Sequence, residues 1–110
     1  AAHRAWAARR LDLTADMATI HEGLATRTPF ALPQLILWER LDDFVLVDDG
    51  EIDAAIRLLA AQAHLVAEGA GAAALAGALR LRDRLAGRKV VGVLSGANVP
   101  LSRYAGILAG

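Results

Sequence analysis

The stretch Val90-Val91-Gly92-Val93-Leu94-Ser95-Gly96-Ala97-Asn98 decides the fold class of this chain. Its valines and leucine form an apolar run without polar alternation, which is typical of a parallel strand covered on both faces. Ser95 and Asn98 then place two hydrogen-bonding side chains around a tight turn. Because ligands of open α/β sheets bind at the ends of strands, we predict that this loop holds a ligand.

The rest of the chain alternates between helical and extended patterns. The apolar run over 44–47 predicts a second buried strand. Helices are expected over 1–10, 33–41, 51–63, 72–86 and 102–108. This order indicates an α/β fold. Since two strands are few for a self-standing sheet, we expect the chain to be a fragment of a larger one.

Acidic and hydroxyl side chains mark two helix starts. Asp48 followed by Glu51 has the spacing of a capping box, and so has Thr19 followed by Glu22. A metal site at the first acid cluster is disfavoured, because no further ligands converge there. His21 beside Glu22 is a poor general-base pair, since adjacent residues on a helix point apart. In the helix over 33–41, three apolar side chains are expected to face a core, namely Leu35, Ile36 and Trp38.

Composition excludes several classes of function. The 110 residues are enough for one small domain, and their net charge of +0 provides no basic field for nucleic acid. The chain has no cysteine, which excludes disulfides and thiolate chemistry and agrees with a cytoplasmic protein. No apolar run reaches the roughly 20 residues that span a bilayer. A hydrophobic share of 55% is high for a small domain, so we expect part of this surface to face something outside the chain.

A glycine motif offers a nucleotide-binding alternative. Gly69-Ala70-Gly71-Ala72-Ala73-Ala74 matches the dinucleotide pattern G-x-G-x-x-A at a helix start, where phosphate groups bind. The next strand, however, ends in Leu94-Ser95-Gly96 and lacks the acid that holds a ribose. Glu68 would also repel a pyrophosphate. We therefore expect these glycines to allow close packing at a sharp helix entry, with nucleotide binding as the weaker alternative.

Four segments resemble motifs of one enzyme family. Thr19-Ile20-x-x-Gly23-Leu24-Ala25 resembles the T-I-A-D-G-L-A segment of threonine and serine dehydratases. Val45-Leu46-Val47, followed by Glu51-Ile52, resembles their V-V-x-V-x-D-x-E-I segment. Glu68-Gly69-Ala70-Gly71-Ala72 is similar to their E-x-[AS]-G-A, and Val93-Leu94-Ser95-Gly96-Ala97-Asn98 to their V-L-S-G-G-N. Order and spacing agree over essentially the whole chain, which therefore resembles the fold-type II pyridoxal-phosphate enzymes, a group that includes serine racemase.

The resemblance implies an architecture and an activity. The fold would be a fragment of an open, mostly parallel three-layer sandwich like the tryptophan synthase β large domain. Residues 1–110 would be the C-terminal portion of the catalytic domain that binds pyridoxal 5'-phosphate, without an internal boundary. The parent enzyme would eliminate the hydroxyl group of threonine or serine and release a 2-oxo acid and ammonia. As partners we expect the missing N-terminal part of the enzyme, a small amino-acid substrate and further copies of the chain, but no nucleic acid and no membrane.

The resemblance also assigns roles to single residues. The hydroxyl of Ser95 would bond the pyridine nitrogen of the cofactor as a neutral partner, and Gly96, Ala97 and Asn98 would shape the loop around it. Glu68 would lie near the cofactor ring. The backbone around Gly23 would lie against one face of the cofactor.

No catalytic residue is expected in this chain. The family's cofactor-binding lysine and glycine-rich phosphate loop have no match, since the only lysine is Lys89 in a different context. We therefore expect the isolated chain to be inactive. The chain departs from the family pattern at His21, Glu22, Ala97 and Pro100. The alternatives are a non-catalytic α/β assembly module and a related enzyme such as serine racemase.

Overall fold

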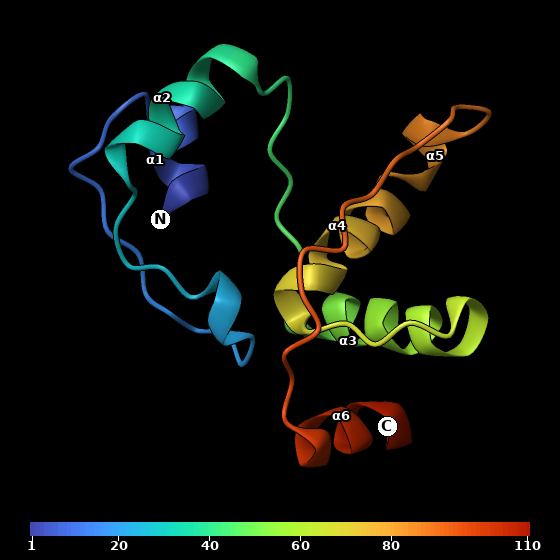
Figure 1. Cartoon of the computed structure of the whole chain (residues 1–110). Helices are drawn as coiled ribbons and strands as arrows, with labels where there is room; N and C mark the ends of the chain where they lie inside the picture. The colour runs from blue at the N-terminus through green and yellow to red at the C-terminus, as the bar shows by residue number, and fades with distance from the viewer. The chain divides into compact units, whose positions relative to one another are not determined.

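A computed structural model describes all residues from 1 to 110, and every regular element in it is helical (Figure 1). The elements are α1 (Ala2–Ala8), the 3-10 turn η1 (Glu22–Leu24), α2 (Ala31–Arg40), α3 (Asp49–Leu58), the π-helical turn η2 (Leu59–Ala63), α4 (Gly69–Arg80), α5 (Arg82–Leu85) and α6 (Leu101–Ala109). They belong to two compact units, residues 1–19 with 25–46 and residues 20–24 with 47–110. None of the helices is long and apolar enough to cross a membrane.

The first unit is built from α1 and α2. Ala5 is fully buried, and the indole Nε1 of Trp38 donates a hydrogen bond to its carbonyl oxygen at 3.1 Å. Beyond α1, the Arg10 guanidinium hydrogen-bonds to Asp12 at 2.9 Å, and this bond lowers the pKa of the Asp12 carboxyl. The helix predicted over 1–10 is confirmed over Ala2–Ala8, and Arg4, Arg9 and Arg10 are exposed.

The predicted inner face of α2 is partly wrong. Trp38 is half-buried as expected, but Leu35 and Ile36 are exposed and Gln34 is buried instead. Gln34 and Trp38 are four residues apart and therefore share a helix face, whereas Leu35 lies at the edge of this face and Ile36 on the opposite side. Apolar character alone did not identify the face that packs on α1.

The second unit has a core made of small and branched aliphatic side chains. Ile52, Ala55 and Ile56 of α3 pack against Ala72 and Ala76 of α4. Ala67, which precedes α4, and Ile107 of α6 complete this cluster. Because alanines add little bulk, helix backbones can approach closely, which fits the extensive packing of α3 against α4.

The helix boundaries refine the sequence prediction. The capping box at α3 is confirmed, since the Asp48 carboxylate accepts from the Glu51 N–H and the Glu51 carboxylate accepts from the Asp48 N–H, both at 2.8 Å. The helix predicted over 72–86 begins earlier and is interrupted at Leu81, which separates α4 from α5. The helix start expected at Thr19 and Glu22 is only the 3-10 turn η1, which begins at Glu22, and α6 begins at Leu101 after Pro100.

Neither predicted strand is present. Residues 44–47 and 90–94 form no strand, and Val91 and Val93 are 91% and 70% exposed. A strand is defined by hydrogen bonds to a neighbour, and neither segment has such a ladder. The helical part of the predicted α/β order is therefore observed, whereas the sheet is not formed by this chain.

Candidate functional site

A small cavity lies within the second unit. It encloses about 220 Å³ between the turn η1, the start of α4 and the segment that leads into α6. Three predicted cofactor-binding residues line it, namely Gly23, Glu68 and Asn98. Typical ligand pockets enclose roughly 300–1,000 Å³, so this cavity has room for only part of a cofactor and substrate.

The start of α4 is joined directly to the loop that contains Gly96. The Glu68 N–H donates to the Gly96 carbonyl oxygen at 3.1 Å. A Cβ atom on Gly71 would overlap the same carbonyl oxygen, and a Cβ atom on Gly96 would overlap the Glu68 carboxylate. Both glycines are therefore needed for the approach of the two segments, which confirms the close packing expected at this helix start.

Ser95 and Ala97 flank Gly96 outside the cavity lining. Both are exposed, so the Ser95 hydroxyl is open to a ligand. Asn98 is also exposed and marks where the loop enters the cavity wall. The structure thus gathers the six predicted residues around one helix start, with Glu68 and Gly96 in direct contact.

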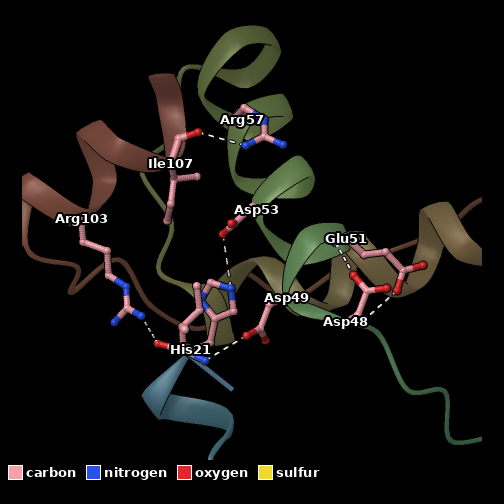
Figure 2. Close-up of polar contacts among 9 residues, drawn as sticks. His21, Asp48, Asp49, Glu51, Asp53, Arg57, Arg103 and Ile107 are labelled. Atoms are coloured by element: carbon pink, nitrogen blue, oxygen red, sulfur yellow. Dashed lines mark hydrogen bonds and ion pairs between the residues drawn. The ribbon is translucent and has the colours of Figure 1, made fainter. Parts of the chain in front are cut away.

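The turn that carries Gly23 is held by α3 and α6 (Figure 2). The Ile20 N–H donates to Asp49 Oδ2 at 2.9 Å, and the Arg103 guanidinium donates to the Ile20 carbonyl oxygen. Within the turn, the Leu24 N–H donates to the His21 carbonyl oxygen at 2.9 Å. These bonds fix the backbone on either side of His21.

Two side chains of the site, Asp53 and Arg103, were not identified from the sequence. His21 is buried and lies 3.4 Å from Asp53 of α3, measured from Nε2 to Oδ1, while Glu22 points to solvent. The prediction that His21 and Glu22 do not form a general-base pair is therefore confirmed. Arg103 of α6 also lines the cavity. Only the departure of His21 from the alanine of T-I-A-D-G signalled an unusual environment, and nothing in the sequence pointed to Asp53 or Arg103.

Comparison with known proteins identifies the family. Residues 1–96 match the family described as "Pyridoxal-phosphate dependent enzyme". The chain belongs to this pyridoxal-phosphate dependent enzyme family. The match covers all of the predicted cofactor-binding residues except Ala97 and Asn98, which follow it directly.

Three proteins similar to this chain are named as enzymes that act on amino acids. The L-threo-3-hydroxyaspartate ammonia-lyase of Saccharomyces cerevisiae is 35% identical over 92 residues, which cover 84% of this chain and 28% of that protein. A threonine deaminase structure from T.th. superimposes with a TM-score of 0.79 at 33% identity, covering 91% of this chain and 36% of that one. The serine racemase structure from Dictyostelium discoideum superimposes with a TM-score of 0.77 at 30% identity, covering 89% of this chain and 31% of that one.

This pyridoxal-phosphate family member spans roughly a third of each relative. Its residues fit one side of a cofactor site, because the Gly71–Gly96 approach brings backbone close to a helix start and Ser95 presents an open hydroxyl. The family uses pyridoxal phosphate, and its relatives at about this identity include ammonia-lyases. The Gly69-Ala70-Gly71 segment therefore serves packing at this site, as the sequence analysis expected.

Proposed function

We propose that this chain forms one side of the cofactor site of a pyridoxal-phosphate dependent ammonia-lyase. The enzyme removes the hydroxyl group and then the amino group of threonine, serine or a related β-hydroxy amino acid, and releases a 2-oxo acid and ammonia. The chain supplies no lysine in the family's context, so it acts together with the remaining part of the enzyme, and the two parts together complete an open, mostly parallel three-layer sandwich.

One observation carries this proposal. The Glu68 N–H bonds to the Gly96 carbonyl oxygen, and Gly23, Glu68 and Asn98 line one cavity, although these residues come from three separate family motifs. A packing role alone would not require a cavity where the three motifs meet. The ammonia-lyase and deaminase names of the relatives then favour elimination as the reaction.

The residues of this chain bind and orient. Bound pyridoxal phosphate supplies an electron sink for negative charge that develops at the substrate Cα. The Ser95 hydroxyl would bond the pyridine nitrogen as a neutral partner and would not stabilise a proton on that nitrogen as a carboxylate does. Gly96, Ala97 and Asn98 would shape the loop around the cofactor, Glu68 would lie beside the ring, and the backbone at Gly23 would cover one face.

The test replaces Ser95 by aspartate in the complete enzyme. A carboxylate at this position favours a protonated pyridine nitrogen, so we expect a changed absorption spectrum of the bound cofactor and at least roughly a tenfold loss of elimination rate, about 1.4 kcal/mol in barrier height. Ser102→Asp introduces the same charge at another exposed serine, in the first turn of α6, and is the control. An unchanged spectrum and rate in the Ser95 variant would remove Ser95 from the site.

Serine racemase is the second candidate. The similarity to a serine racemase structure favours it, since the TM-score of 0.77 is close to that of the deaminase. Racemisation and elimination both begin with loss of the Cα proton, so the cofactor side that this chain forms serves either. Assay of the complete enzyme with L-serine separates them, because racemisation yields D-serine and elimination yields a 2-oxo acid. A complete enzyme without bound pyridoxal phosphate would instead support a non-catalytic assembly module.

A further inference from the structure

His21 occupies an unusual position for an ionisable side chain. Its side chain is only 3% exposed, and its Nε2 atom faces Asp53 Oδ1 at 3.4 Å. Asp53 is itself mostly buried, and both facing atoms are shielded from solvent. The 3.4 Å contact is at ion-pair distance, and neither atom makes a hydrogen bond. Because burial of an imidazole or a carboxylate is unfavourable without a polar partner, this contact between η1 and α3 offsets part of the cost of burying both groups. This pair lies outside the six residues assigned to the cofactor.

The ring of His21 fills the space between the turn and α4. A Cβ atom on Gly69 would overlap the imidazole, so glycine at the first position of α4 makes room for the ring. Two residues further along the turn, a Cβ on Gly23 would lie 2.8 Å from the Cβ of Ala70. The turn therefore packs on the start of α4 at two points, and His21 supplies the larger contact.

Charged groups from three helices surround this turn. They are Asp49 and Asp53 from α3, Glu68 at the start of α4 and Arg103 from α6, together with Glu22 of the turn itself. Asp49 and Arg103 hold the backbone at Ile20, whereas Asp53 is the group that faces the His21 side chain (Figure 2). Removal of the imidazole would leave the Ile20 bonds intact but open a void beside Gly69.

We propose that His21 is a positioning residue. Paired with Asp53, its imidazole fixes the Ile20–Leu24 turn on α3 and α4 and so sets the position of the Gly23 backbone that covers the cofactor. The role of the turn toward the cofactor rests on the proposed function, whereas its fixation by His21 does not.

The first experiment measures hydrogen exchange in the complete enzyme without bound pyridoxal phosphate. The Leu24 N–H closes the turn on the His21 carbonyl, so its exchange reports local opening. We expect His21→Ala and Asp53→Asn to speed this exchange at least about tenfold, and His21→Gln, which keeps a polar group near Asp53, to restore part of the protection. The Leu85 N–H, bonded to the Leu81 carbonyl, is the internal control and should not change. Unchanged exchange at Leu24 in His21→Ala would overturn the proposal.

The second experiment measures pyridoxal-phosphate affinity of the complete enzyme by fluorescence titration. We expect His21→Ala to weaken cofactor binding about tenfold and Asp53→Asn to weaken it by a similar factor. The double variant should bind as tightly as His21→Ala, because the effects of paired residues are not additive. Faster exchange at Leu24 with unchanged cofactor affinity would overturn the link to the cofactor. Failure of the unsubstituted enzyme to bind pyridoxal phosphate would refute the proposed function instead, and the exchange rates would still decide whether His21 fixes the turn.

Discussion

The starts of α3 and α4 lie in the same unit and are built in opposite ways. Each follows an acid in extended backbone, Asp48 with φ −93° and Glu68 with φ −79°. Asp48 exchanges two hydrogen bonds with Glu51 and completes its helix start locally. Glu68 makes no capping bond with its side chain, and its N–H bonds instead to Gly96 in a distant segment.

This difference separates a stabilising helix start from a functional one. The capping box at α3 uses its two carboxylates for the helix itself. At α4 the carboxylate is left to face Gly96 and the cavity. The approach of the two segments depends on Gly71 and Gly96, and Gly69 makes room for the His21 ring. Proteins tend to break local rules of helix design where a site needs the freed group. We therefore expect that added side-chain volume at the glycines of α4, and loss of the capping carboxylate at α3, both lower the free energy of unfolding.

The largest effect is expected from Gly71→Ala. Its Cβ would overlap the carbonyl oxygen of Gly96, which is backbone and cannot swing aside. We expect the free energy of unfolding to fall by about 3 kcal/mol, as for strong overpacking, measured by urea denaturation. Gly77→Ala in the same helix is the control, because a Cβ there meets no atom within 4 Å. That control should gain about 0.5–1 kcal/mol, and equal losses in both variants would refute the steric account.

Asp48→Ala should destabilise the chain by about 1–2 kcal/mol through loss of the cap. Glu68→Ala, the same truncation at the other start, should cost about 0.5 kcal/mol or less, because only the favourable charge near the helix end is lost. Thermal and urea unfolding of the two variants give the comparison. If Glu68→Ala is the more destabilising of the two, the division into a stabilising and a functional start is wrong.

Gly96→Ala should have an intermediate effect of about 1 kcal/mol. Its Cβ would overlap only the end of the Glu68 side chain, which can rotate away, unlike the backbone that Gly71 meets. The double variant Gly96→Ala with Glu68→Ala should therefore be less destabilised than the two single effects combined. Strict additivity in the double-mutant cycle would show that Glu68 and Gly96 do not interact.

The smallest effect is expected from Arg80→Ala. Arg80 Nη1 bonds the Glu51 carboxylate at 2.8 and 2.9 Å, but the two side chains are 49% and 31% exposed. Half-exposed ion pairs contribute about 0.5 kcal/mol, and salt weakens them further. The difference between Arg80→Ala and the unsubstituted chain should shrink as sodium chloride is raised, whereas the cost of Asp48→Ala should persist.

Local patterns in the sequence predicted what local physics determines. The Asp48–Glu51 capping box needs only residues three apart, and it formed as predicted. The glycines at 69 and 71 were correctly assigned to close packing because Glu68 and the missing ribose acid argued against phosphate. The family motifs also placed Glu68 and Gly96 in one site before their contact was observed.

Features that depend on distant partners were not predictable in the same way. Val91 and Val93 have the character of a buried strand, but pairing requires neighbours that this chain does not supply. The inward face of α2 was missed because Gln34 is buried, against its usual preference. His21 and Asp53 are far apart in sequence, and only the fold brings them together.

The exposed segment from Val90 to Leu94 has a consequence for the chain in solution. An apolar, β-prone run without a partner strand is a template for self-association of the cross-β type. Arg88 and Lys89 precede it directly, and charges in such flanking positions act as gatekeepers against aggregation. We therefore expect Arg88 and Lys89 to raise the concentration up to which the purified chain stays monomeric. In the complete enzyme, the same two side chains would lie beside the strand that pairs with the segment starting at Val90.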